Sequence, residues 1–357
     1  MPDGEVTPVP GVGAASAPTK AAAPVVAVPA TTSSAASAPT RQPRPARDDP
    51  HAFVLAESDE FHCHLLGVEG GSAYVGSDEA LFGIPVDLGA RRTVFRGPMG
   101  GSLRTAGALA IRRQPGQHFL ERYHLVSLAD GSTRELADAA YVTAWTTDAT
   151  NVYWADDKYD DPRVWTVPFS GGEPKVVEEL AAVGNEDRIG RIVVRDGKAT
   201  VQVKRRWLHT GSGRACQEIR HGTLGKTRPL WRDQACIAGK PTRGSVQGLS
   251  VSPGYVYFSR GDALWRVARR GGRPELLFDR QAFAQFTWSD DAWLVWSNHR
   301  KLFRIRLDRG AKVADPLADD VVQANAVHVV EGHVYWTQRT PEGPCQVRRR
   351  ALDAPAR

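Results

Sequence analysis

The chain has 357 residues, of which 41% are hydrophobic and 24% are charged, and its formal net charge is +6. No segment approaches the roughly 20 consecutive apolar residues of a membrane-spanning helix, so we expect no transmembrane segment. The positive charge is modest for this length and does not by itself indicate a nucleic-acid partner, which we do not expect.

Residues 1–50 differ in composition from the rest of the chain. Ala, Pro, Thr and Ser dominate this segment, and it lacks aromatic residues. Such a composition cannot support a packed core, so we expect a disordered tail or linker. The segment has no uninterrupted apolar stretch behind a basic start, and therefore no visible signal peptide. The remainder, residues 51–357, is long enough for one folded domain.

A four-residue pattern recurs along this domain. V-Y-W-A at 152–155 returns as V-Y-F-S at 256–259, as L-V-W-S at 294–297 and as V-Y-W-T at 334–337. Short runs rich in aromatic and β-branched residues favour strands over helices. Self-similarity at about 40 residues, with several short strands in each copy, is typical of the four-stranded blades of a β-propeller.

The number of blades depends on two weak copies, which occupy residues 108–128 and 199–220. The clear copies centre on Tyr74, Tyr153, Tyr257, Val295 and Tyr335. The sequence therefore predicts an all-β fold, a single propeller of seven four-stranded blades. Six or eight blades are the alternatives if a weak copy is misread.

The last copy lacks a fourth strand. Residues 346–350 have the pattern of a third strand, and no convincing fourth strand follows them. Closing a propeller removes the exposed sheet edges that invite aggregation. The apolar segment 52–56 is otherwise unassigned, so we expect it to pair with the last blade as its missing outer strand.

The four cysteines fit this arrangement. Cys216 and Cys345 each begin a third strand, whereas Cys236 and Cys63 lie a few residues beyond a fourth strand. We therefore predict two disulfides, Cys216–Cys236 and Cys63–Cys345; the alternative is four unpaired, partly buried thiols. Persistent disulfides need an oxidising compartment. We thus expect an extracytoplasmic protein of the periplasm or cell surface, whose export or lipoprotein signal is not visible in this sequence; the alternative is a cytoplasmic protein with reduced thiols.

An acidic cluster follows the strand at 152–155. Asp156, Asp157, Asp160 and Asp161 place four carboxylates within six residues. Calcium accepts oxygen ligands from irregular loops, so a calcium site is one interpretation, although the spacing is not that of an EF-hand. The other interpretation is a solvated acidic turn, since paired aspartates recur elsewhere in the chain.

Catalytic motifs are missing from the sequence. It contains no Gly-x-Ser-x-Gly elbow, no P-loop and no dinucleotide fingerprint. The recurrent tryptophans are expected to pack between blades. We therefore assign no catalytic and no cofactor-binding residue. Residues 204–248 lengthen the fourth copy, and such insertions can lie on a binding face, so contacts with a partner are expected there first; the alternative is simple length drift in a tolerant loop.

Arginines crowd the last three blades. Several alternate with apolar residues, as expected where one face of a strand is packed and the other is solvated. A basic face for a polyanion is the other interpretation. These residues are Arg266, Arg269, Arg270, Arg273, Arg300, Arg304, Arg306, Arg309, Arg348, Arg349 and Arg350.

The V-Y-W-T, L-W-R-V and Gly-Gly-x-Pro elements resemble those of bacterial extracytoplasmic propellers of the YWTD, TolB and NHL-like kind. The resemblance covers roughly residues 52–352 and implies the architecture without any binding-site residue. Our first hypothesis is a monomeric, non-enzymatic binding or scaffold protein of the cell envelope that contacts a protein or polysaccharide through a loop face. The alternative is a metal-dependent propeller lyase or hydrolase with its site at the mouth of the central channel.

Overall fold

The computed structural model shows an all-β fold, and no helix occurs among the residues that it describes. These residues belong to the compact unit formed by residues 40–357. They are 44–46, 49–61, 63, 65–77, 79–87, 89–96, 103–106, 109–115, 120–140, 142–156, 162–180, 187–207, 214–233, 246–279, 284–290, 292–298, 301–308, 314–318, 327–339 and 343–355.

Six blades contain four antiparallel strands each, and consecutive strands of a blade pair with one another. In chain order, these strands are β3 (Leu65–Glu69), β4 (Ser72–Gly76), β5 (Ala80–Pro85) and β6 (Arg92–Arg96); β7 (Leu103–Ala106), β8 (Leu109–Pro115), β9 (Leu120–Ser127) and β10 (Thr133–Ala140); β11 (Val142–Thr147), β12 (Asn151–Asp156), β13 (Arg163–Pro168) and β14 (Lys175–Glu179); β15 (Arg188–Arg195), β16 (Lys198–Trp207), β17 (Arg214–Thr223) and β18 (Arg228–Arg232); β19 (Val246–Val251), β20 (Tyr255–Arg260), β21 (Ala263–Ala268) and β22 (Glu275–Phe278); β23 (Ala284–Ser289), β24 (Trp293–Asn298), β25 (Lys301–Arg306) and β26 (Asp315–Ala318).

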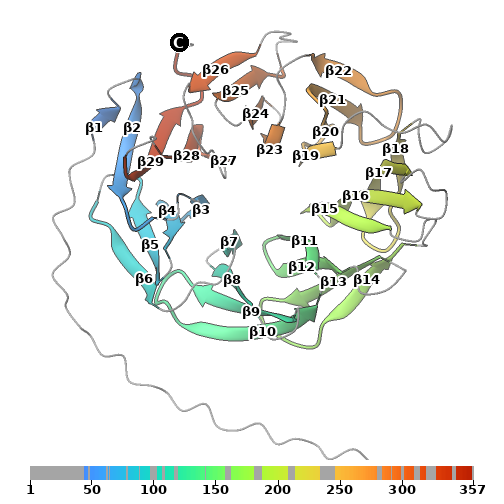
Figure 1. Cartoon of the computed structure of the whole chain (residues 1–357), viewed down its shortest axis with the longest axis horizontal. Helices are drawn as coiled ribbons and strands as arrows, with labels where there is room; N and C mark the ends of the chain where they lie inside the picture. The colour runs from blue at the N-terminus through green and yellow to red at the C-terminus, as the bar shows by residue number, and fades with distance from the viewer. Residues whose placement is uncertain are drawn as a thin grey trace, which may run out of the picture. The chain divides into compact units, whose positions relative to one another are not determined.

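The remaining sheet joins the two ends of the domain and has five strands, in the order β1-β2-β29-β28-β27. Figure 1 shows it between β3 and β26. Its strands are β1 (Arg44–Ala46), β2 (Asp49–Ser58), β27 (Val327–Val330), β28 (His333–Arg339) and β29 (Cys345–Ala351).

The prediction of seven four-stranded blades is therefore wrong, because six blades have four strands and the closing sheet has five. The extra strand is β1, at residues 44–46, which the sequence assigned to the tail because of its Pro-rich composition. The segment 52–56, expected to supply the outer strand, lies within β2, and Ala52 pairs with Arg350 of β29. The strands thus begin before residue 51, where the sequence placed the start of the domain.

The recurring second-strand motif packs one blade against the next. Trp296 is fully buried, in a cluster with Tyr257 of the preceding blade and Phe303 of its own. Trp336 is likewise fully buried, in a cluster with Val295. Burying such a side chain contributes roughly 3 kcal/mol before the cost of ordering it. The repeat therefore encodes the contact between neighbouring blades.

In Figure 1 the strands nearest the centre of the ring are β3, β7, β11, β15, β19, β23 and β27. A disulfide between Cys63 and Cys345 links the segment before β3 to the start of β29, which is the pairing predicted from the strand order. The Thr337 hydroxyl donates a hydrogen bond to the Cys63 carbonyl at 2.8 Å. Cys216 is also disulfide-bonded. Its predicted partner, Cys236, lies outside the described residues, so that pairing stays a prediction.

Candidate functional site: a basic pocket between two blades

A pocket of about 880 Å³ lies where the β15–β18 blade meets the β19–β22 blade. It is formed by the ends of β16, β17, β18, β20 and β21 and by the β17–β18, β19–β20 and β21–β22 turns. In an antiparallel blade the first and third turns lie at the same end of the sheet, so these segments come together. The residues that line it are Lys198, His221, Gly222, Thr223, Lys226, Arg228, Pro253, Gly254, Tyr255, Ala268, Arg269 and Arg270.

The pocket is strongly basic. Five of its lining side chains are Lys or Arg, and none is Asp or Glu. Four of these cations form no side-chain hydrogen bond or ion pair with any other residue in the described part of the chain, namely Lys198, Lys226, Arg228 and Arg270. Unpaired cations gathered around a concave surface create a positive potential that attracts anions.

The fifth cation, Arg269, is held in place. Its Nε–H donates to Nε2 of His221 at 3.0 Å, and its Nη1 donates to the carbonyls of Ser252 and Pro253 at 3.3 and 3.2 Å. Its Nη2 has no hydrogen-bond partner among the described residues. A guanidinium fixed along one edge with free N–H groups on the other can bind an oxyanion without a large loss of side-chain entropy.

The buried ring of His221 is neutral in this environment. Its Nε2 accepts from Arg269, so Nδ1 carries the proton and donates to the Thr200 hydroxyl at 2.8 Å. Burial and the nearby charges of Arg269, Lys198 and Arg228 lower the pKa of His221 from 6.5 to about 4. The three cations therefore lie close enough to this ring to act on it together, with no compensating carboxylate.

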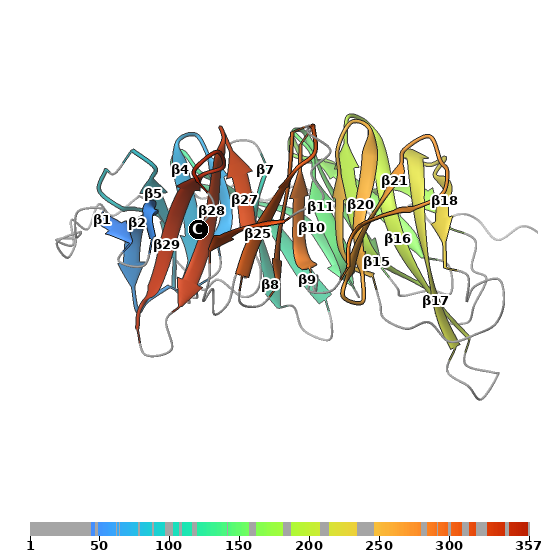
Figure 2. The same cartoon turned by 90° about the horizontal axis from the view of Figure 1, so that it is seen from above.

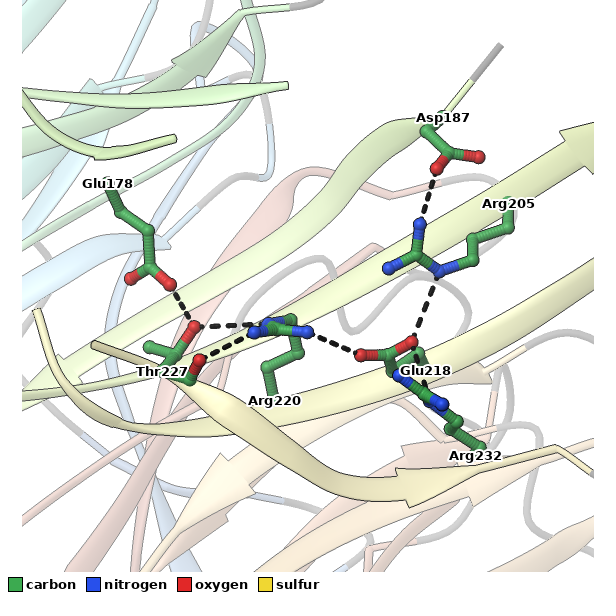
Figure 3. A network of polar contacts seen from close by, with 7 residues as sticks. All are labelled: Glu178, Asp187, Arg205, Glu218, Arg220, Thr227 and Arg232. Carbon is green, nitrogen blue, oxygen red and sulfur yellow. Dashed lines mark hydrogen bonds and ion pairs between the residues drawn. The ribbon is translucent and has the colours of Figure 1, made fainter. Parts of the chain in front are cut away.

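A second contact network anchors the turn that carries Lys226 and Arg228. Thr227 lies between these two residues in the sequence, and Figure 3 shows Arg220 in contact with it. The Arg220 Nε donates to the Thr227 hydroxyl at 3.2 Å, and Nη2 donates to the Thr227 carbonyl at 2.5 Å. A Cβ at Gly222 would lie 2.9 Å from the Lys226 carbonyl oxygen, so glycine allows the turn to close.

The network is centred on the buried carboxylate of Glu218. Glu218 forms ion pairs with Arg205, Arg220 and Arg232 at 3.1, 2.8 and 3.1 Å. Asp187 also pairs with Arg205, at 2.5 Å. Burial alone would raise the pKa of Glu218, but its contacts with Arg205, Arg220 and Arg232 lower it.

The same network reaches the preceding blade. The Thr227 hydroxyl donates to the buried carboxylate of Glu178 in β14, as drawn in Figure 3. The turn with Lys226 and Arg228 is thus tied both to its own blade and to its neighbour. This arrangement holds two of the unpaired cations at the pocket.

The acidic cluster predicted as a calcium site is described in part. Asp156 is buried at the end of β12, and its Oδ2 accepts a hydrogen bond from Trp165 Nε1 at 2.6 Å. Asp157, Asp160 and Asp161 lie outside the described residues, so the calcium site stays a prediction. Within the described ranges, no group of three His, Cys, Asp or Glu side chains is arranged to hold a metal ion. No helix long and apolar enough to cross a membrane occurs there either.

The arginines of the last three blades differ in their environments. Most are paired: Arg266 with Glu275 and Arg306 with Asp308, each at 2.8 Å, while Arg350 donates to main-chain carbonyls. Arg269 and Arg270 instead line the pocket. The residues of this set that lie outside the described ranges are Arg300 and Arg309.

Sequence reasoning missed three of the five cations, Lys198, Lys226 and Arg228. The last two lie in the lengthened region 204–248, but part of that extra length continues strands β16 and β17 rather than forming a loop. Figure 2 shows β17, which pairs along its whole length with β16, extending beyond β18. A comparison of the first and third turns in adjacent copies of the repeat could have predicted that the five cations lie near one another.

No protein-family model matches the chain, and no curated protein matches its sequence. Among solved structures, it is similar to an oligogalacturonate lyase from Vibrio parahaemolyticus, at 9% identity over 88% of this chain and 97% of that one, with a TM-score of 0.58. It is also similar to the tricorn protease, at 11% identity over 85% of this chain and 35% of that one, with a TM-score of 0.57.

A third similar structure is the propeller domain of the Trilobed protease from Pyrococcus furiosus, at 11% identity over 86% of this chain and 92% of that one, with a TM-score of 0.53. Identities this low show the fold and nothing finer. The resemblance to YWTD, TolB and NHL-like propellers therefore stays a prediction at the level of family, and the chain is a β-propeller.

Proposed function

We propose that this propeller is a non-enzymatic binding protein that takes an anionic group of its partner into the basic pocket. One observation carries the proposal: four of the five cations that line the pocket have no partner in the described residues, and no carboxylate lines it. Isolated cations on a surface are common, but unpaired cations from two blades converging on one concavity are the arrangement expected of an anion site.

The proposal includes a location outside the cytoplasm, in the cell envelope. The Cys63–Cys345 disulfide supports it, because disulfides between buried cysteines persist in oxidising compartments. The alternative of a metal-dependent lyase or hydrolase has no observation in its favour among the described residues. The similarity to oligogalacturonate lyase is one of fold at 9% identity and carries no activity to this chain.

Binding of anionic polymers to matched variants tests the proposal. The pocket variant Lys226→Ala/Arg228→Ala and the control Lys175→Ala/Arg273→Ala lose the same charge, but Lys175 and Arg273 do not line the pocket. Polygalacturonate and polyglutamate serve as anionic probes, and dextran serves as the neutral one. Titrations are followed by calorimetry at low and at physiological salt.

We expect the pocket variant to lose about tenfold in affinity for at least one anionic probe, and the control less than about twofold. Binding by the wild-type protein should weaken as salt rises, because salt screens exposed charges. Equal losses in the two variants would indicate a diffuse charge effect and overturn the pocket assignment. Failure of the wild-type protein to bind any anionic probe would overturn the proposed function itself.

A further inference from the structure

We infer that the ligand of this pocket is an acidic oligosaccharide, with a sugar ring against Tyr255 and its carboxylate or sulfate groups against the lysines and arginines. This inference rests on the proposed anion-binding function. It adds a ligand class, which charge alone does not define.

Tyr255 is the exposed aromatic residue of the pocket. It is 36% exposed, and among the described residues it is the one aromatic side chain with such large exposure. The Arg266 guanidinium lies over its ring, 4.5 Å from the centroid, and Arg266 is in turn held by Glu275 at 2.8 Å. The ring is therefore positioned before a ligand arrives, which lowers the entropy cost of binding. An aromatic ring of this kind offers an apolar face for the C–H groups of a sugar.

Neutral hydrogen-bonding groups lie in the same pocket. The hydroxyls of Tyr255 and Thr223 have no hydrogen-bond partner among the described residues. Each can both donate and accept, so each can pair with a sugar hydroxyl. A pocket that combines cations, free hydroxyls and an aromatic ring matches a ligand with anionic groups, hydroxyls and C–H faces.

The size of the pocket and the distribution of its charges favour a ligand larger than a single ion. Its volume of about 880 Å³ lies near the upper end of the usual range for small-molecule sites, roughly 300–1,000 Å³. Cations reach it from the ends of β16, β18 and β21. A single phosphate or sulfate ion offers them one anionic group, whereas an oligosaccharide with several acidic residues offers several along its length.

An acidic peptide is the main competing ligand. Extended peptides commonly bind by pairing with an exposed strand edge. The pocket is formed by turns and strand ends, and the backbone of Gly222 and Ala268 is already paired within the blades. A peptide would therefore make side-chain contacts there without the main-chain ladder that gives most of its affinity.

Four defined probes separate these ligand classes. They are a galacturonate hexasaccharide, a sulfated heparin-derived hexasaccharide, neutral maltohexaose and hexaglutamate, each titrated into the whole protein by calorimetry. The variants are Tyr255→Ala and Tyr255→Phe, with Leu276→Ala as a control at another exposed position of the same blade. Melting temperatures of all variants show whether each remains folded.

We expect one or both acidic saccharides to bind at least tenfold more tightly than maltohexaose and hexaglutamate. Tyr255→Ala should weaken saccharide binding about three- to tenfold, Tyr255→Phe less, and Leu276→Ala not at all. Preference for the galacturonate probe would identify carboxylates as the recognised groups, and preference for the heparin-derived probe would identify sulfates; either result supports the inference.

Tight binding of hexaglutamate, equal to or exceeding that of both saccharides, would overturn the saccharide assignment and leave the anion-binding function intact. Unchanged saccharide affinity in a folded Tyr255→Ala variant would likewise overturn the saccharide assignment and leave the anion-binding function intact. Absence of binding to all three charged probes would overturn the proposed function together with this inference.

Discussion

Arg269 Nε donates to His221 Nε2 over 3.0 Å, so the neutral imidazole of one blade fixes the guanidinium of the next. The ring's other nitrogen is committed to Thr200. A doubly protonated ring would direct an N–H at Arg269 and repel it. The orientation of the pocket's one anchored arginine therefore depends on a histidine that stays uncharged.

Replacing Arg269 by lysine tests whether the fixed guanidinium is needed or only its charge. A lysine has a single nitrogen, which cannot occupy the positions of both Nε and Nη1 of Arg269, so we expect anion affinity to fall about tenfold with the net charge unchanged. The control is Arg273→Lys in the same turn, outside the pocket. Equal affinities of both variants for the best anionic probe, measured by calorimetry, would show that the anchoring contacts do not matter.

His221 should make folding stability depend on pH. Its pKa in the folded protein is about 4, below the ordinary 6.5, so between these values the unfolded chain takes up a proton that the folded chain does not. Stability should therefore fall as the pH is lowered through this window, by roughly 1–3 kcal/mol from this residue.

Urea unfolding at pH 7 and pH 4.5 measures this dependence. The wild-type protein is compared with His221→Gln, because other groups titrate over the same range and cancel in the difference. The wild-type protein should lose more stability than the variant between the two pH values. Parallel losses would mean that His221 titrates normally in the folded state.

The buried carboxylate of Glu218 should contribute much more to stability than an exposed one. Glu218→Gln leaves Arg205, which is also buried, without one of its two carboxylate partners, and we expect a loss of about 2–4 kcal/mol in the free energy of unfolding. Glu275→Gln removes the exposed pair with Arg266 and should cost less than about 1 kcal/mol. Denaturant midpoints that fall equally in both variants would contradict the structural role assigned to this network.

The Cys63–Cys345 disulfide should stabilise the closed ring. Its cysteines are separated by 282 positions, and the chain-entropy model gives about 5 kcal/mol for a loop of this size. Cys63→Ser/Cys345→Ser should therefore unfold at a lower denaturant concentration than the wild-type protein. Intact mass after thiol alkylation supplies the control, since four alkylated cysteines in unreduced wild-type protein would show that neither predicted disulfide forms.

The repeat was readable because its residues carry the packing between blades. Trp296 and Trp336 recur at the same place in the pattern and are both fully buried in the structure. Strand β1 was not readable, because Arg44, Pro45 and Ala46 have no strand-like pattern of their own. Their conformation depends on pairing with β2, and an edge strand of three residues leaves little trace in a sequence.

The pocket was harder to predict than the fold. Lys198, Lys226 and Arg270 are far apart in sequence and lie in turns or at a strand end, where charged residues are common. What distinguishes them is the lack of partners, and partners depend on three-dimensional contacts. Arg266 and Arg269, three positions apart, illustrate this: the first pairs with Glu275, whereas the second is held by a histidine of another blade.

The pairing of β2 with β29 also constrains the order of events during synthesis. Strand β2 leaves the ribosome early, but its partner β29 is made almost 300 residues later. At a translation rate of about 5–20 residues per second, residues 49–58 wait without that partner for a time on the order of 15–60 seconds. During this interval an apolar strand from the start of the domain has an unsatisfied edge, so the nascent chain needs protection from misassembly until its last strand emerges.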